Sequence, residues 1–299
     1  MTDANSPSLS SLTEQFPILQ HGHYLNRAAV GPWPRCTAEA VKRFADENMR
    51  QGAAGYREWY QREDRLREGL RIMLGASDSA DIALLKNTSE GISTVAFGLD
   101  WQPGDNIVLP AGEFPSNRLP WLAQEVKGVE VREVDIRAAE NAEQALLEAM
   151  DANTRLLTVS AVQWSDGFRL DLQRLGKICH QRGVLFFVDA IQQLGALPMD
   201  VETCQIDFLA ADAHKWLLAP EGVAVFYCRE SARPQLTLLQ QGWHMFENPL
   251  NFERTQWNPA SSAKRFEAGS PNTVGQAALH ASVELLLGYG MDKAVSYTH

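Results

Sequence analysis

Short apolar runs alternate along this chain with amphipathic stretches of helical length, and this alternation restricts the possible folds most strongly. Runs that are almost wholly apolar are typical of strands buried on both faces, and helices between them are typical of parallel connections. We therefore predict an α/β fold with a mostly parallel sheet that is covered by helices on both faces. Ligands of such sheets bind beyond the carboxyl ends of the strands, so functional residues are expected just after the runs. The predicted strands are Asp81–Leu85, Asn106–Leu109, Val129–Val134, Arg155–Ser160, Val184–Val188, Asp207–Ala210 and Val223–Tyr227.

The remaining segments are organised around these runs. Residues 1–23 begin with a polar, Ser-rich stretch and are predicted to form an N-terminal arm. One large domain is predicted over residues 24–288. Residues 229–264 interrupt the alternation with a polar segment that we interpret as a packed loop. The predicted helices are Thr37–Arg50, Glu58–Leu74, Glu140–Met150, Leu172–Arg182 and Val274–Leu287.

Composition limits the class of protein and its partners. The 299 residues carry a formal net charge of -10, which disfavours a nucleic-acid or anionic-membrane surface. The N-terminus has neither the basic start nor the apolar core of a signal peptide, and no apolar run approaches the length of a membrane span. The four widely spaced cysteines are interpreted as reduced thiols, and His21-Gly22-His23 lacks partners for a metal. We expect a cytoplasmic protein without a metal site.

Lys215 is the lysine with the most unusual surroundings. The chain has seven lysines, and five of them lie in polar or amphipathic stretches that indicate solvated side chains. Lys215 lies between apolar residues just past a predicted strand. Partial burial disfavours the ammonium form and lowers the pKa of an amine, as attack on an aldehyde requires. Taken alone, however, Lys215 fits better a side chain that reaches from a loop to solvent.

A second candidate is the carboxylate that ends the apolar run Phe186–Val188. A pyridoxal 5'-phosphate (PLP) cofactor needs an anion against its pyridine nitrogen to keep that nitrogen protonated. Asp189 stands where this anion is needed, and Gln192 can hydrogen-bond the ring oxygen. An Asp that only caps the next turn is the competing interpretation.

A third candidate is the segment 86–93, in which a predicted strand leads directly into a helix. Backbone N–H groups at a helix N-terminus, with the hydroxyls of Thr88 and Ser89 beside them, form a cradle for phosphate. The same residues are also good helix caps. Lys86 is the one rival of Lys215 for a covalent bond to the cofactor, but its place before the cradle suits a charge near phosphate better.

Five motifs in order resemble the class V aminotransferase family. This fold-type I group of PLP-dependent enzymes includes aminotransferases, cysteine desulfurases, kynureninase and isopenicillin N epimerase-like proteins. The resemblance runs from about Tyr24 to the last predicted helix, and it implies the large domain of a fold-type I transferase with a seven-stranded, mostly parallel sheet. The motifs are segments 87–91 (NTSEG), 112–117 (GEFPSN), 188–192 (VDAIQ), 213–215 (AHK) and 265–272 (RFEAGSPN).

The resemblance also implies roles for individual residues. Lys215 would be the catalytic residue that carries PLP as a Schiff base and moves protons. Ser270 would reach the phosphate of a neighbouring subunit, so a homodimer with shared active sites is implied. The segment with Asn26, Ala28 and Ala29 would border the amino acid substrate. The residues implied to bind the cofactor are Thr88, Ser89, Phe114, Asp189, Gln192, His214, Lys215 and Ser270.

The chain departs from the family at three points. Asp212 stands two residues before His214 where many relatives have Ser, and an anion near phosphate is unfavourable, so Asp212 is expected to point elsewhere. Ala161 stands where desulfurases often have Asn, with Gln163 and Trp164 following. Relatives continue for about another hundred residues, so residues 289–299 are interpreted as the start of a truncated C-terminal domain.

Transamination by a class V aminotransferase is therefore the expected activity. A cysteine desulfurase, or another PLP-dependent lyase or epimerase, is the alternative within the enzyme class. A catalytically inactive PLP-fold protein that acts as a binding partner is a further alternative. The identity of the amino acid substrate does not follow from the sequence.

Overall fold

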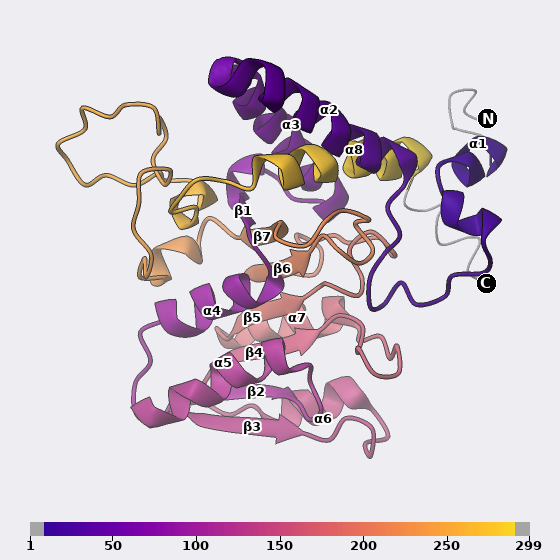
Figure 1. The fold of residues 1–299 in the computed structure, drawn as a ribbon. Coiled ribbons are helices and arrows are strands. Elements are labelled where there is room, and N and C mark those ends of the chain that lie inside the picture. Colours follow the sequence, from indigo (N-terminus) through magenta and orange to yellow (C-terminus); the bar gives the residue numbers. More distant parts are fainter. Residues whose placement is uncertain (1–8, 291–299) are drawn as a thin grey trace.

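A single seven-stranded sheet organises the computed structural model, which describes residues 9–290 (Figure 1). The strand order is β1-β7-β6-β5-β4-β2-β3, and every neighbouring pair is parallel except the two that involve β7. The prediction of a mostly parallel sheet is therefore confirmed. The strands are β1 (Ile82–Leu85), β2 (Asn106–Pro110), β3 (Glu130–Val134), β4 (Thr154–Ser160), β5 (Leu185–Asp189), β6 (Phe208–Asp212) and β7 (Ala224–Cys228).

The predicted helices are all present, with ends displaced by no more than two residues. Two further helices, α4 and α5, lie between β1 and β3 in the chain, and α1 lies inside the predicted N-terminal arm. The helices are α1 (Leu9–Glu14), α2 (Arg35–Gln51), α3 (Tyr56–Leu74), α4 (Thr88–Gly98), α5 (Leu119–Leu122), α6 (Ala142–Ala149), α7 (Leu172–Arg182) and α8 (Thr273–Tyr289). In residues 9–290, no helix is both long and apolar enough to cross a membrane.

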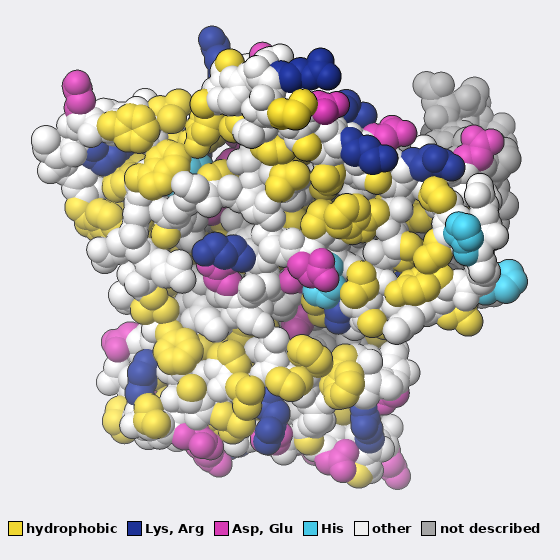
Figure 2. All heavy atoms as spheres, viewed as in Figure 1, with side chains coloured by type: hydrophobic (Ala, Val, Ile, Leu, Met, Phe, Trp, Pro, Cys, Tyr) yellow, Lys and Arg dark blue, Asp and Glu magenta, His cyan; other side chains and the backbone are white. Residues whose placement is uncertain are grey.

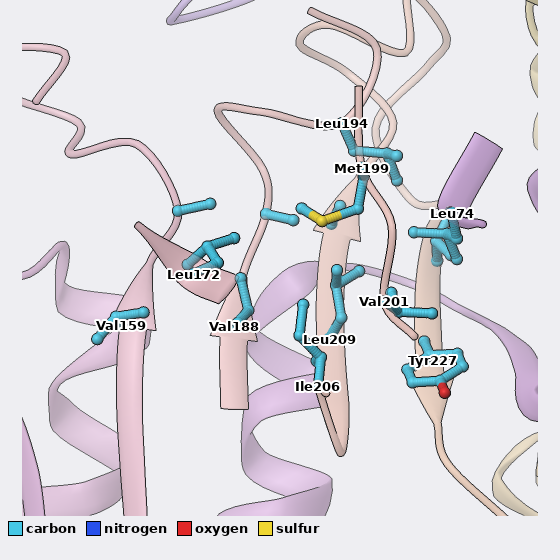
Figure 3. Packing of buried hydrophobic residues seen from close by; sticks show 14 of the residues in the cluster. Leu74, Val159, Leu172, Val188, Leu194, Met199, Val201, Ile206, Leu209 and Tyr227 are labelled. Atoms are coloured by element: carbon cyan, nitrogen blue, oxygen red, sulfur yellow. The ribbon is translucent and has the colours of Figure 1, made fainter. Parts of the chain in front are cut away.

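Each face of the sheet has its own hydrophobic core, because successive strand residues point to opposite sides. In β5, Phe186 and Val188 pack with residues of α3, α6, α7 and α8, and part of this core is drawn in Figure 3. Phe187 packs on the other face with residues of α4 and α5. Helices therefore cover both faces of the sheet, as predicted.

The same alternation decides to which face of the sheet the polar residues at the strand ends point. Asp189 comes two residues after Phe187 and so faces the α4 side of the sheet. Asp212 comes two residues after Ala210, which also packs on that side. The two strands lie next to each other in the sheet, so both carboxylates reach the same place at its carboxyl edge.

The structure describes the surroundings of both ends of the predicted large domain without testing its boundaries. The arm is tied to the domain because Arg35 Nε donates to the Glu14 carbonyl at 2.8 Å. Helix α8 ends at Tyr289, and residues 291–299, predicted to begin a C-terminal domain, lie outside the described residues. The boundaries therefore stay a prediction.

Candidate active site

A cavity of about 530 Å³ opens at the carboxyl edge of the sheet on the α4 side. Acidic, basic and histidine side chains gather near the hollowed middle of the face shown in Figure 2. Most residues predicted to bind cofactor or substrate line this one cavity: Asn26, Ala28, Ala29, Thr88, Ser89, Phe114, Gln192, His214 and Lys215. The sequence had not assigned a site role to the other lining residues, which are Asn87, Ser116, Trp164, Ile191 and Asp212.

Lys215 presents the amine of the cavity. It follows β6 by three residues and is 9% exposed. Burial lowers the pKa of its amine, while the negative charges of Asp189 and Asp212 act in the opposite direction. Its Nζ lies 5.7 Å from the centroid of the Phe114 ring. The neutral, nucleophilic form of the amine is therefore more populated in Lys215 than in a solvated lysine.

Asp189 is a buried carboxylate near that amine. It ends β5, is 2% exposed, and its Oδ1 accepts a hydrogen bond from the Ile191 N–H at 3.0 Å. Burial raises its pKa to about 7; the Ile191 N–H lowers the pKa, Glu113 raises it further and Lys215 lowers it. A buried carboxylate with one backbone donor is suited to pair with a cationic ring nitrogen, which would favour its ionised form.

Gln192 joins the floor of the cavity to the N-terminal segment. Its Nε2 donates to the Ala28 carbonyl at 3.0 Å, and its Oε1 accepts from Trp216 Nε1 at 2.9 Å. The Gly31 N–H donates to the His214 carbonyl at 2.7 Å, and a Cβ on Gly31 would lie 1.9 Å from the Lys215 carbonyl oxygen. The segment predicted to border the substrate therefore packs directly on the loop of the reactive lysine.

The N-terminus of α4 supplies donors to the same cavity. Asn87 caps the helix, because its Oδ1 accepts from the Glu90 N–H at 2.8 Å. The Thr88 Oγ1 accepts from the Asp212 N–H at 2.9 Å, which leaves its own hydroxyl hydrogen available to a ligand. The Ser89 hydroxyl donates to Ser116 Oγ at 2.7 Å. Hydroxyls and a helix N-terminus together form an anion site.

Asp212 lies inside the cavity, which corrects the expectation that it points elsewhere. The alternation of β6 leaves it no other face, since Phe208 and Ala210 already point to the α4 side. Its Oδ1 lies 2.9 Å from His214 Nδ1, so an acid–imidazole pair lines the wall. The negative charge of Asp212 is thereby directed at the imidazole.

Three predicted or rival residues do not line the cavity of Lys215: Asp189, which is buried close to the Lys215 amine, Ser270 and Lys86. Ser270 is exposed and lines a neighbouring cavity of about 420 Å³. Lys86 also lines that neighbouring cavity and does not line the one with Lys215. A role for Ser270 at a neighbouring subunit stays a prediction.

The four cysteines are free thiols, as interpreted from the sequence, and none of them lines the cavity within residues 9–290. Burial raises the pKa of the thiol to about 11 in Cys204 and to about 12 in Cys179. Burial also raises the pKa of Cys36 and Cys228. The thiols are therefore held in their protonated form.

Trp164 lines the cavity, and the buried Glu113 holds the loop that carries Trp164; the sequence analysis gave neither residue a site role. The buried carboxylate of Glu113 accepts from the Ser160 N–H at 2.7 Å, from Ser160 Oγ at 2.5 Å and from Gln163 Nε2 at 2.9 Å. Trp164 meets the Phe114 ring edge to face, with centroids 5.7 Å apart. The available signal was an acid inside an apolar segment directly after a strand, the position where functional residues were expected.

A second cluster of titratable groups lies away from this cavity. Glu63, His244 and Glu267 bring possible ligand atoms within 4.8 Å of one another. The Arg67 guanidinium hydrogen-bonds Glu63 and holds both carboxylate oxygens of Glu267, at 2.7 and 2.8 Å. Because Arg67 already pairs with both carboxylates, we interpret the cluster as an ion-pair network that holds α3 against the sheet.

Comparison with known proteins identifies the family and the fold of the chain. The family Aminotransferase class-V matches residues 23–299. A probable cysteine desulfurase of Methanothermobacter thermautotrophicus is 32% identical over 92% of this chain and 69% of its own length. The crystal structure of the cysteine desulfurase CsdA from Escherichia coli superposes with a TM-score of 0.86 at 28% identity, covering 98% of this chain and 75% of that one.

A third relative is a lyase. The cystine C–S lyase C-DES, in complex with its reaction product cysteine persulfide, superposes with a TM-score of 0.86 at 26% identity, covering 93% of this chain and 75% of that one. Another structure of C-DES holds glycine covalently linked to its PLP cofactor. C-DES is thus a PLP-dependent relative with the same fold as this chain.

The chain belongs to the class V aminotransferase family. Both the predicted fold class and, for the family, the predicted cofactor are confirmed. The residues present fit PLP, because one cavity brings together a buried amine and a helix N-terminus with hydroxyls, and a buried carboxylate lies close to that amine.

Proposed function

We propose that this chain binds PLP at Lys215 and acts on the α-carbon of an amino acid, cleaving the C–S bond of cysteine or a close relative of cysteine. The observation that carries the proposal is the buried Lys215 amine, which shares a cavity with the N-terminus of α4. When bound, PLP would supply an electron sink for chemistry at the α-carbon of the substrate.

The side chains around the cavity can carry out the other tasks. Lys215 Nζ takes the α-proton and can return it, because its lowered pKa leaves the amine able to accept a proton. Asp189 would pair with the pyridine nitrogen of the cofactor and favour its protonated form. Thr88, Ser89 and the first turn of α4 would hold the phosphate, and Gln192 would keep the segment around Ala28 against the substrate.

C–S cleavage is favoured by the relatives, which include a probable cysteine desulfurase, CsdA and a cystine C–S lyase. Transamination, the activity expected first from the sequence, is the second candidate. It needs no thiol in the active site, and in residues 9–290 no cysteine lines the cavity. Both reactions begin with the same proton transfer at Lys215.

The cofactor site is tested by borohydride reduction of the PLP-loaded protein, followed by digestion and mass spectrometry. We expect one pyridoxyl group on the peptide that contains Lys215, and none in Lys215→Ala. Lys86→Ala is the matched control and should keep the label. A label on Lys86, or a folded protein without any label, would contradict the proposal and favour an inactive PLP-fold protein.

The reaction is tested with the same preparation and L-cysteine in the presence of dithiothreitol. C–S cleavage with return of the proton gives one alanine and one sulfide for each cysteine consumed, while dithiothreitol is oxidised. Amino transfer that depends on an added α-keto acid, without sulfide, would instead establish transamination. Loss of substrate chirality without either product would indicate an epimerase.

We also propose that two copies of the chain associate and share their sites. The support is the position of Ser270, which is exposed and outside the cavity of Lys215, where a neighbouring chain can meet it. A cytoplasmic location likewise stays a prediction.

A further inference from the structure

We propose that Trp164 is a positioning residue that fixes the Phe114 ring against the cofactor plane. This inference rests on the proposed function, since it requires PLP at Lys215. Phe114 directly precedes the short helical segment Pro115–Asn117 after β2, and its ring centroid lies 5.7 Å from Lys215 Nζ. A planar ring bonded to that nitrogen is therefore within reach of the Phe114 ring.

Phe114 has little to hold its ring from the solvent side. The side chain is 41% exposed, and the ring meets no aromatic ring other than Trp164 among the described residues. The two rings are 5.7 Å apart at 73°, so the edge of one faces the plane of the other. This geometry is attractive between aromatic quadrupoles and restricts rotation of the exposed ring.

Trp164 is itself held in place although it is 48% exposed. Its indole Nε1 donates to the Gly112 carbonyl at 3.0 Å, which ties the loop after β4 to the end of β2. The loop closes on itself through a bridge between Val162 and Arg169. The hydrogen bond from Nε1 restricts rotation of the indole. The Trp164 ring can therefore restrict rotation of the Phe114 ring that it contacts.

Glu113 links the same two loops, the one after β2 and the one after β4, through buried hydrogen bonds. Its carboxylate takes three donors from Ser160 and Gln163, so the residue before Phe114 is bonded to the residue before Trp164. Burial raises the pKa of this carboxyl, and the three hydrogen bonds oppose that effect. The links through Glu113 and the indole hydrogen bond together set the distance between the two aromatic rings.

The test compares Trp164→Ala, Trp164→Phe and the wild-type chain by PLP titration and visible circular dichroism. For Trp164→Ala we expect PLP affinity to fall by roughly 2- to 12-fold, which is the contribution of one aromatic pair. The circular dichroism per bound PLP should also fall, because the cofactor ring loses its fixed neighbour. Trp164→Phe should recover part of the signal, and borohydride should still label Lys215 at saturating PLP.

Trp257→Ala is the matched control. Trp257 is 56% exposed and meets Phe246 at the same 5.7 Å centroid distance, edge to face, but it does not line the cavity. This variant should match the wild type in both measurements. A labelled Lys215 with unchanged affinity and dichroism in Trp164→Ala would overturn this inference alone. An unlabelled wild-type Lys215 would overturn the proposed function and this inference with it.

Discussion

In the chain without cofactor, few interactions offset the cost of removing the Asp189 carboxylate from water. It is almost fully buried and has one backbone donor, and burial raises its pKa to about 7. The nearby Lys215 charge favours ionisation of Asp189 without overcoming the loss of water. The residue therefore destabilises the cofactor-free fold at neutral pH, and a cationic ring nitrogen would remove that penalty.

We expect this penalty to appear in the pH dependence of stability. Between pH 4 and pH 7 the folded cofactor-free chain keeps a proton on Asp189 that the unfolded chain releases, so the free energy of unfolding falls as pH rises. The loss is complete above pH 7 and amounts to at most about 4 kcal/mol, at about 1.4 kcal/mol per pKa unit. Urea unfolding of cofactor-free wild type and Asp189→Asn at pH 4 and pH 8 measures it.

The Asn side chain cannot ionise, so Asp189→Asn should lack this component while sharing all others. The two proteins should be similar at pH 4, and the variant should be the more stable at pH 8. Equal pH slopes in the two proteins would show that Asp189 is not penalised. With PLP bound the order should reverse, because only the carboxylate can pair with the ring nitrogen.

At the scale of single elements, α4 links helix capping to ligand binding. Asn87 both caps the helix and lines the cavity. Asn141 caps α6 in the same way, through a hydrogen bond from the Gln144 N–H at 2.7 Å, but does not line the cavity. Comparing Asn87 with Asn141 therefore separates the effect of helix capping on stability from its effect on ligand binding.

Replacing either Asn by Ala is expected to lower the free energy of unfolding by about 1 kcal/mol, the usual contribution of a cap. Asn87→Ala should also weaken PLP binding, because the first turn of α4 no longer holds its N–H groups in place for phosphate. Asn141→Ala should bind PLP as the wild type does. Chemical denaturation and PLP titration of both variants test this, and equal PLP affinity in the two would exclude the capping link.

The elements were largely predictable from the sequence, because strands that are apolar throughout differ clearly from amphipathic helices. The direction of β7 was not predicted, since an apolar pattern is the same in either direction. The antiparallel direction of β7 follows from the connection between Asp212 and Ala224, which contains no helix. A parallel connection needs a dozen or more residues and is usually helical, so the shorter link returns the chain antiparallel.

The sequence singled out Lys215 and Asp189 because each stands just after a predicted strand, and the structure brings the two close together; their roles stay a prediction. The site was not predictable where position depends on packing. Trp164 reaches the cavity through a loop whose shape depends on Glu113, and Asp212 was assigned by analogy instead of by the alternation of β6. Contacts between loops that are far apart in sequence leave no periodic signal.

For the whole molecule, the expected association of two chains has a direct test. Sedimentation equilibrium should give twice the mass of one chain. Ser270→Ala should weaken PLP binding at concentrations where the chain is dimeric, although Ser270 does not line the cavity of its own chain. A monomer that binds PLP with full affinity would show that each site is complete within one chain.

The position of β7 also sets an order of events during protein synthesis. Among residues 9–290, β7 is the one strand beside β1, and Leu85 pairs with Ala224. At roughly 5–20 residues per second, a ribosome needs about 7–28 s to make the residues between them. Throughout that time the apolar β1 has no sheet partner, and α4, which follows it directly, has no finished sheet to pack on. We therefore expect the α4 wall of the cavity to be completed only after β7 has left the ribosome, and the apolar β1 to stay without a sheet partner until then.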